Sequence, residues 1–459
     1  MPFGKVIQRI HWGVEIVRIC YLIHVFPPES WGGSENYVFR LAQQLRLQHE
    51  IRVLTRTHRS DEPEYKIFRE NVDGLEVFRL NNNFRDVDRF ERIYWNPKVD
   101  EIMETFLGEW RPDIIHAHHL TCLSTNLVNI AHRHSIPFVL TLHDFWMMCL
   151  RGQRLHPTLR LCEEVLPSVC GQCVKPWMDG AYAKAITDRF GSDKDQRNLL
   201  NRARRKLFKF LTRPNPSREI EAFHQHSRRI LKEADLLISP SVFLRDEFVR
   251  FGCDPEKILL SDNGIDPGLV GREDCQPSSK VRFGFVGTLI PSKGVHVLVA
   301  AFRQMPPGRA ELKIFGGAAE FEGFPDYFEN LQRQAQGLPI EFRGKFANKE
   351  IGRVLSEIDV LIVPSIWFEN APLTIREALL AQIPVITADR GGMAESVQDG
   401  VNGLLFEMGN PKSLANAMLR LVEEPALLEE LGSAETPVKT IADNARELEE
   451  IYARLCKMQ

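Results

Sequence analysis

Short apolar runs that alternate with helical segments constrain the fold of this chain more than any other feature. Arg18–His24 and Ile51–Thr55 have the length and composition of buried parallel strands, and Glu35–Gln48 between them carries apolar residues at helical spacing. The same order returns along the chain, with strand-like runs at Ile114–Ala117, Phe138–Leu142, Leu236–Ser239, Val281–Val286, Leu312–Phe315, Val360–Val363 and Val385–Thr387. Strands that alternate with helices predict parallel, doubly wound sheets.

The length of the chain predicts more than one such sheet. Its 459 residues exceed what one ordinary core accommodates and suit two α/β domains plus an insertion. The alternation breaks at about 147–230, and a polar stretch near 267–280 precedes the second series of strands. We therefore expect domains at 1–270 and 271–435, the insertion within the first, and a final helical segment at 436–459. Ligands usually bind between two such domains, at the carboxyl ends of their strands.

Composition excludes several classes of protein. A hydrophobic content of 44% with 26% charged residues is typical of a globular chain. The formal net charge of −3 argues against a whole-molecule polyanion binder, so no nucleic-acid partner is expected. No apolar run reaches the roughly 18 residues of a membrane-spanning helix. The first seventeen residues lack the continuous apolar core of a signal peptide, and we expect a cytoplasmic protein in reducing surroundings.

The most informative stretch leads into a predicted helix in the second half of the chain. Pro372 suits the first turn of that helix, and the N–H groups of Leu373 and Thr374 would be unpaired at its positive end, which makes a phosphate site. Glu369 just before the helix and Glu377 one turn into it can accept paired hydrogen bonds from vicinal hydroxyls. For an isolated pair of glutamates, an acidic helix start stabilised by the helix dipole is the alternative.

Two glycine-containing loops accompany this helix. Gly287 follows a predicted strand and permits close backbone approach, while Lys293 precedes a helix that begins near Gly294 and can place a positive charge on a phosphate. Taken alone, this loop is a common strand–turn–helix with a solvated lysine. Asp389–Glu395 follows another predicted strand and adds a second glycine loop with an acid.

In this order, the motifs resemble those of family 4 retaining glycosyltransferases of the GT-B fold, in which two Rossmann-like domains face a cleft. The matching elements are the Gly32-Gly33 loop, His143-Asp144, Asn263–Asp266, Gly287 with Lys293-Gly294, Glu369-x7-Glu377 and Gly391-Gly-x-x-Glu395. They cover roughly 18–148 and 234–424. The resemblance implies an acceptor-side N-terminal domain, a nucleotide-sugar-binding C-terminal domain, and a last helix that crosses back to the first domain.

The resemblance also implies roles for individual residues. His143 would contact the transferred sugar, Glu369 its hydroxyls and Lys293 the diphosphate, and these three are the expected catalytic residues. The expected donor-binding residues are Gly32, Gly33, Gly287, Thr288, Lys293, Gly344, Lys345, Asn370, Ala371, Pro372, Leu373, Thr374 and Glu377, of which Glu377 would bind the ribose. Thr288 departs from the family, which usually has arginine there. Either Arg390, Arg376 or another base replaces that cation, or donor binding is weaker.

The expected function is therefore a hexosyltransferase that moves a sugar from a UDP- or GDP-sugar, with retention, to a glycan or lipid-linked acceptor in polysaccharide or cell-envelope glycan assembly. Lys293 and helix N–H groups would stabilise the departing diphosphate, so catalysis is expected to need no metal or other cofactor. One alternative is a nucleotide-sugar epimerase of similar architecture, which would release a changed sugar without an acceptor. Another is a non-catalytic nucleotide-sugar-binding partner, which only Thr288 favours.

Four cysteines cluster in the predicted insertion, at Cys149, Cys162, Cys170 and Cys173. They have the ligand number of a structural zinc site made of four thiolates. Thiolates also suit an iron–sulfur cluster, and four metal-free thiols or disulfides are further alternatives. A zinc ion would tie down an insertion that is otherwise poor in core residues.

A basic helical segment follows the cysteines. Between Arg197 and Arg213 the apolar residues share one helical face, with cations around it. Such a segment can rest on an anionic membrane surface, which would place the protein at the inner face of the membrane and suit a lipid-linked acceptor. A solvated helix packed on its own domain is the alternative.

Overall fold

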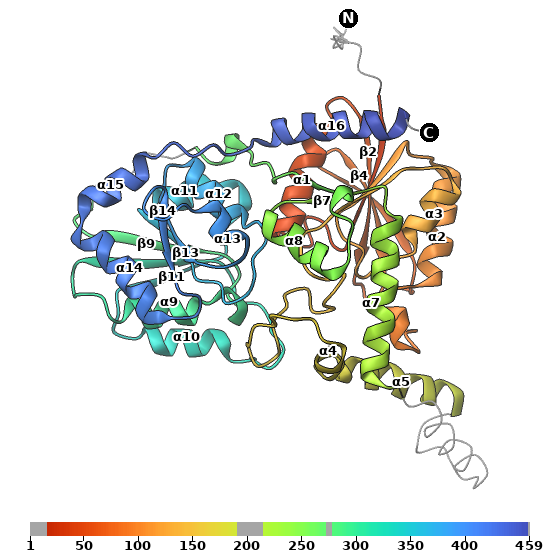
Figure 1. Cartoon of the computed structure of the whole chain (residues 1–459), viewed down its shortest axis with the longest axis horizontal. Coiled ribbons are helices and arrows are strands. Elements are labelled where there is room, and N and C mark those ends of the chain that lie inside the picture. The colour runs from red at the N-terminus through yellow and green to blue at the C-terminus, as the bar shows by residue number, and fades with distance from the viewer. Residues whose placement is uncertain (1–15, 191–213, 272–277, 458–459) are drawn as a thin grey trace, which may run out of the picture.

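The computed structural model describes residues 16–190, 214–271 and 278–457. It contains two α/β units, each built on a central sheet, and helix α16 (Ile441–Lys457) lies along the N-terminal unit (Figure 1). The basic segment at 197–213, for which membrane contact is predicted, lies outside the described residues. Within the described residues, no helix has the length and apolar character that crossing a membrane requires.

The N-terminal unit contains an eight-stranded sheet in the order β3-β4-β2-β1-β5-β6-β7-β8. All neighbouring strands are parallel except β3 and β4, which pair antiparallel. The strands are β1 (Arg18–Ile23), β2 (Glu50–Thr57), β3 (Ile67–Val72), β4 (Leu75–Asn81), β5 (Ile114–Ala117), β6 (Phe138–Thr141), β7 (Leu236–Ser239) and β8 (Ile258–Leu260). The helices are α1 (Gly33–Leu45), α2 (Pro97–Glu109), α3 (Leu127–Arg133), α4 (Pro167–Cys173), α5 (Lys175–Phe190), α7 (Pro216–Glu233) and α8 (Val242–Phe251).

The C-terminal unit contains a six-stranded parallel sheet in the order β11-β10-β9-β12-β13-β14. Its strands are β9 (Val281–Val286), β10 (Ala310–Phe315), β11 (Ile340–Gly344), β12 (Val360–Val363), β13 (Val385–Ala388) and β14 (Gly403–Phe406). Its helices are α9 (Val295–Phe302), α10 (Tyr327–Ala335), α11 (Ile351–Ser356), α12 (Leu373–Leu380), α13 (Gly391–Ser396), α14 (Pro411–Glu423) and α15 (Pro425–Ser433). The prediction of two doubly wound α/β domains is confirmed.

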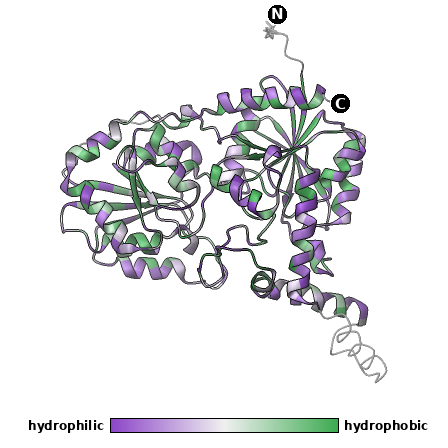
Figure 2. Ribbon diagram, in the orientation of Figure 1, coloured by the Kyte–Doolittle hydropathy of each residue, from purple (hydrophilic) through white to green (hydrophobic). Residues whose placement is uncertain are grey.

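Strand β1 shows why the central strands are apolar throughout. Cys20 and Leu22 belong to the hydrophobic cluster on one face of the sheet, and Ile19, Tyr21 and Ile23 belong to the cluster on the other. Both faces of a central parallel strand are covered, so alternation of apolar and polar residues is absent there. Figure 2 shows the same distribution, with hydrophobic residues along the strands and hydrophilic residues on the outer surfaces of the helices.

The β3–β4 hairpin was not predicted, although the chain carries a signal for it. Asp73 and Gly74 join the two strands with φ of 47° and 86°, and an Asp-Gly pair with positive φ is typical of a two-residue hairpin turn. The hairpin extends the N-terminal sheet at its edge. Arg79 of β4 donates hydrogen bonds to the carbonyls of Phe26 and Pro27, so the hairpin contacts the loop that follows β1.

Candidate functional site

The carboxylate of Glu369 is the centre of a hydrogen-bonded cluster in the loop between β12 and α12. Its Oε1 atom accepts hydrogen bonds from Lys293 Nζ at 2.7 Å, Ser365 Oγ at 2.7 Å and Trp367 Nε1 at 2.9 Å. Glu369 is buried, with 6% of its surface exposed. Three donors on one oxygen fix the orientation of the carboxyl group, so the other oxygen has a defined direction for a ligand. Ser365 was not among the predicted site residues.

The backbone around Glu369 depends on the glycine pair of the neighbouring loop. The N–H of Gly392 donates to the carbonyl of Glu369 at 2.7 Å. A Cβ atom at Gly392 would lie 1.7 Å from the carbonyl oxygen of Asn370, so only glycine fits at this position. The predicted Gly391-Gly392 loop therefore supports the Glu369 loop from behind.

Helix α12 begins one residue later than predicted. Pro372 occupies the N-cap with φ of −64°, and Leu373 is the first helical residue. Proline has no backbone N–H group, so it loses no hydrogen bond at this end of a helix. Its fixed φ suits both the N-cap and the first turn. Among the described residues, the N–H groups of Leu373 and Thr374 have no hydrogen-bond acceptor, as is usual for a helix start. The helix start for which phosphate binding is predicted therefore has two unpaired N–H groups.

Glu377 lies in the second turn of α12 and is 7% exposed. Burial raises the pKa of its carboxyl group to about 7, and the positive charge of Arg40 opposes this rise. Arg40 comes from α1 of the N-terminal unit, and its Nε atom is buried without a hydrogen-bond partner among the described residues. A buried carboxyl group with so high a pKa is destabilising when ionised, which is typical of residues kept for binding or catalysis. Sequence reasoning missed Arg40.

Lys293 is held by the turn that precedes α9. Gly294 caps this helix with φ of 71°, and a Cβ atom there would lie 1.8 Å from the carbonyl oxygen of Pro364. The glycine thus allows the Lys293 loop to approach the strand end that leads to Ser365 and Glu369. Thr288, in the same loop, is exposed.

The two arginines considered as replacements for the missing cation at Thr288 both contact carboxylates. Arg376 Nε donates to Asp262 at 2.8 Å, and Arg390 Nη1 lies 3.2 Å from Glu163. Each guanidinium keeps further N–H donors, and Nη1 of Arg376 has no hydrogen-bond partner among the described residues.

His143 follows β6 in the N-terminal unit and faces this cluster. Its carbonyl oxygen accepts a hydrogen bond from Asn370 Nδ2 at 3.0 Å, and its Nε2 atom lies 3.1 Å from His118 Nδ1. Burial lowers the pKa of His143 to about 3, with further lowering by nearby His119 and His24 and an opposing effect of Asp144. The imidazole is therefore neutral at pH 7, and one of the two histidines donates the shared proton to the other.

A row of histidines connects His143 to the C-terminal helix. The rings of His118 and His116 stack with centroids 4.1 Å apart, and the His118 and His143 rings stack at 5.4 Å. His116 Nδ1 lies 2.6 Å from the hydroxyl of Tyr452 in α16. The sequence shows these histidines only as polar residues at the end of a strand, so their contribution to the site was missed.

The other predicted donor-binding residues lie at the starts of helices and in loops. Gly32 caps α1, and a Cβ there would lie 2.5 Å from the carboxylate of Glu35, which also accepts hydrogen bonds from Ser30 and Ser34. Gly33 begins the helix. In the C-terminal unit, Gly344 ends β11 with φ of 73° and accepts a hydrogen bond from the N–H of Gly316 at 2.8 Å.

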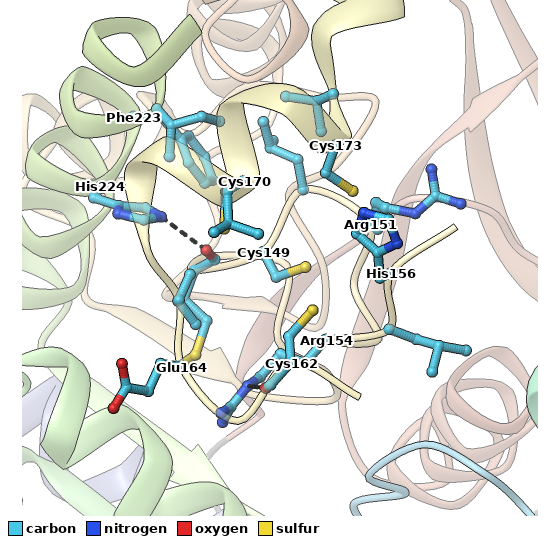
Figure 3. Close-up of a pocket in the computed structure, with 17 residues that line it drawn as sticks. Cys149, Arg151, Arg154, His156, Cys162, Glu164, Cys170, Cys173, Phe223 and His224 are labelled. Carbon is cyan, nitrogen blue, oxygen red and sulfur yellow. Dashed lines mark hydrogen bonds between the residues drawn. The ribbon is translucent and has the colours of Figure 1, made fainter. Parts of the chain in front are cut away.

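Lys293, Ser365 and Glu369 do not line either of two cavities in the structure. One cavity lies beside the histidine row and is lined by His118, His119, Leu120, Leu140, Thr141, Leu142, His143, Asp144, Trp146 and Met147. The residues that line the other include Cys149, Cys162, Cys170 and Cys173 (Figure 3). The structure thus brings Lys293, Glu369 and the start of α12 into one cluster, connects it through Asn370 to His143, and leaves the cysteines in a separate place.

Comparison with known proteins identifies the family. Residues 31–173 match the family described as Glycosyltransferase Family 4, and residues 280–424 match the one described as Glycosyl transferases group 1. A D-inositol 3-phosphate glycosyltransferase of Corynebacterium aurimucosum is 27% identical over 258 residues, which are 51% of this chain and 60% of that protein. An amylovoran biosynthesis glycosyltransferase of Erwinia amylovora is 28% identical over 213 residues, 43% of this chain and 50% of that protein. The matches thus span about half the length of these relatives.

A solved structure shares the fold along the whole chain. HepE from Anabaena, in complex with UDP and glucose, superposes with a TM-score of 0.63 at 18% identity, covering 95% of this chain and 99% of that chain. This likeness, the two family matches and the two facing α/β units agree with one another. The chain belongs to the family 4 glycosyltransferases of the GT-B fold.

Proposed function

We propose that this chain transfers a hexosyl group from a UDP- or GDP-sugar to a hydroxyl of a glycan or lipid-linked acceptor, with retention at the anomeric carbon and without a metal ion. The observation that carries the proposal is the cluster in which Lys293 and the unpaired N–H groups at the start of α12 lie next to the oriented carboxylate of Glu369. The lysine and the positive end of the helix dipole suit a diphosphate, and the adjacent carboxylate suits sugar hydroxyls. Together they suit a nucleotide sugar.

The leaving group determines what this cluster contributes to the reaction. When the bond between the anomeric carbon and the diphosphate oxygen breaks, negative charge develops on the diphosphate, and Lys293 with the N–H groups of Leu373 and Thr374 stabilises it. The acceptor oxygen attacks the same face of the sugar, and its proton passes to the departing phosphate oxygen. Lys293 forms an ion pair with Glu369 at 2.7 Å. When the donor binds, Lys293 must either leave Glu369 for a phosphate oxygen or donate hydrogen bonds to both.

The carboxylates and His143 position the donor rather than react with it. Glu369 binds hydroxyls of the transferred sugar, and Glu377 binds those of the ribose, where its burial makes each hydrogen bond to the ionised form strong. His143 is neutral, so it donates or accepts one hydrogen bond to the sugar without adding charge to the cleft. The names of the relatives, which include amylovoran biosynthesis, support an acceptor in polysaccharide or cell-envelope assembly.

A titration of the purified protein with UDP, GDP and their hexose conjugates tests the donor side. The true donor should raise the melting temperature in a concentration-dependent way, because a ligand at about 100 times its Kd stabilises the folded state by about 2.7 kcal/mol. Lys293→Met should abolish most of this rise. Exposed Lys412 supplies the matched control, Lys412→Met, which should leave it intact.

Product analysis separates the proposed function from its alternatives. Release of nucleoside diphosphate that depends on an added glycan or lipid-linked acceptor, and that does not increase when Mg²⁺ or Mn²⁺ is added, supports the proposal. A changed sugar still attached to its nucleotide, formed without an acceptor, would instead indicate an epimerase. Donor binding without turnover on any acceptor would indicate a non-catalytic binding partner.

A further inference from the structure

We propose that Cys149, Cys162, Cys170 and Cys173 bind one Zn²⁺ ion as four thiolates, at a structural site apart from the Glu369 cluster and independent of the proposed transfer reaction. The four residues are 24 positions apart at most, and all of them line one pocket, as Figure 3 shows. None of them forms a disulfide. Four thiols around one space have the number and chemistry of a tetrahedral zinc site.

Backbone N–H groups aim at two of the four sulfurs. The Cys149 sulfur accepts from the N–H groups of Arg151 and Arg154, and the Cys162 sulfur accepts from that of His156. Burial raises the pKa of both thiols in the metal-free protein, and the backbone N–H groups oppose this rise. Hydrogen bonds of this kind orient the ligands and disperse their charge when a metal is bound.

The loops that carry Cys149 and Cys162 are themselves fixed. The carbonyl of Cys149 accepts the N–H of Gly152 at 2.7 Å, which closes a turn in which Gly152 has φ of 74°. The N–H of Cys162 donates to the carbonyl of Arg154 at 2.9 Å, and Arg154 Nε returns a bond to the Cys162 carbonyl at 3.1 Å. Cys149 therefore lies in a hydrogen-bonded turn, and Cys162 lies at the end of a short hairpin that the Leu155–Leu161 bridge closes.

The other two ligands come from one helix. Cys170 and Cys173 lie three residues apart at the end of α4, so their side chains lie on the same side of the helix. Between them, Gly171 is buried, and a Cβ atom there would lie 2.6 Å from the backbone of Pro216 at the start of α7. The glycine lets α4 pack closely on α7, and this packing fixes the direction in which both sulfurs project.

The charges around the pocket suit an anionic metal centre. A Zn²⁺ ion with four thiolates carries a net charge of −2, and the positive charges of Arg151, Arg154 and Arg160 all favour the ionised form of Cys162. Arg151 acts in the same direction on Cys173. Arg151 and Arg154 both line the pocket. Both arginines also pair with glutamates, Arg151 with Glu322 and Arg154 with Glu247.

The metal-free protein has to lose protons and move sulfur atoms when it binds the ion. Burial raises the pKa of Cys170 to about 12 and that of Cys173 to about 11, so both are neutral thiols at pH 7 until a metal displaces their protons. Within the described residues, no three His, Cys, Asp or Glu side chains already form a ready-made metal site. Tetrahedral coordination with bonds of about 2.3 Å would bring the four sulfurs to roughly 3.8 Å from one another.

A metal here would brace the acceptor side of the cleft. The N–H of Phe145 donates to the carbonyl of Gly152 at 3.1 Å, and a Cβ at Gly152 would lie 2.8 Å from the carboxylate of Asp144. The turn that holds Cys149 is thus in contact with the residues that follow His143. Arg151 continues this connection, because its Nη1 atom pairs with Glu322 of the C-terminal unit at 2.6 Å.

The test is the metal content of the full-length protein, which needs no substrate and so does not depend on the proposed transferase activity. Protein purified under reducing conditions, then exposed to Zn²⁺ and desalted, should retain about one equivalent of zinc by mass spectrometry. Replacement by Co²⁺ should produce the visible bands of a tetrahedral ion and the near-ultraviolet charge-transfer band of thiolate ligands. Removal of the metal should lower the melting temperature by roughly 5 °C.

Variants identify the ligands. Cys170→Ser with Cys173→Ser should retain less than about a fifth of the zinc, whereas Cys253→Ser, which removes a thiol outside the cluster, should retain all of it. If the double variant does not fold, the cobalt spectrum of the unmodified protein still decides. Absence of bound zinc and of the thiolate band after reconstitution would overturn the proposal. So would iron with inorganic sulfide in the purified protein, or zinc that the double variant keeps.

Discussion

Replacing the buried carboxyl group of Glu377 should affect stability and donor binding in opposite directions. Burial raises the pKa of Glu377 from 4.5 to about 7, so the folded protein binds this proton more tightly than the unfolded chain does. Below pH 4.5, Glu377 therefore does not lower the free energy of unfolding. As the pH rises through 7, its ionisation progressively destabilises the folded state. At 1.36 kcal/mol per pKa unit, the penalty at pH 8 is on the order of 3 kcal/mol.

Glu377→Gln removes the ionised group while keeping its size. Without a ligand, the variant should unfold at a higher temperature than the parent at pH 8, by several degrees. The difference in unfolding free energy should fall to less than about 1 kcal/mol at pH 5. With the donor present, the lost charge-assisted hydrogen bonds to the ribose should weaken binding by about 1.5–3 kcal/mol, which is roughly 10- to 150-fold in Kd. Scanning calorimetry and isothermal titration at both pH values measure the two effects.

The parent protein should also show the titration directly. At pH 6, Glu377 is protonated in about nine-tenths of the protein molecules. If donor binding requires the carboxylate, the Kd should therefore rise roughly tenfold from pH 8 to pH 6. Glu377→Gln should remove this dependence, and Glu423→Gln, which changes an exposed glutamate of α14, should keep it. A variant that is less stable than the parent at pH 8, or that binds the donor as tightly, would show that this account of Glu377 is wrong.

The remaining predictions concern the other parts of the site. His143→Ala should lower kcat by roughly 10- to 100-fold while changing the donor Kd less. Steady-state kinetics and binding measurements test this, and an unchanged kcat would exclude the role assigned to His143. Because the pKa of His143 is lowered to about 3, its titration should leave no step in the kcat profile between pH 5 and 8. His118→Phe should lower kcat with little change in donor Kd, because the phenyl ring keeps the stacking but loses the hydrogen bond to His143 at 3.1 Å. A kcat equal to that of the parent would argue against positioning of His143 by His118. Gly392→Ala should weaken donor binding about tenfold or more, because its Cβ would clash with the carbonyl of Asn370. The control Gly108→Ala in α2, where a Cβ meets nothing within 4 Å, should leave donor binding unchanged. Equal Kd values for the two variants would contradict this prediction.

Short-range patterns in the sequence were enough to locate the sheets and the donor loops. Strands β5, β7 and β9 were predicted with the bounds that the structure has, because a short, mainly apolar run of strand length is typical of a strand that is buried on both faces. The order of the glycine loops, Lys293, Glu369 and Glu377 indicated the family for a related reason. Each of these residues lies at the end of a strand or the start of a helix, and parallel strands bring all their carboxyl ends to one edge.

Contacts between distant parts of the chain were decided only by the tertiary structure. The pKa of Glu377 depends on its burial and on Arg40, more than three hundred positions away, and nothing in the local sequence of either residue indicates the other. The same holds for Tyr452, which reaches His116 across 336 positions through the last helix. Local composition determines which residues can form a strand, a helix start or a phosphate loop, whereas the desolvation and the pairing of each side chain depend on what the folded chain places against it.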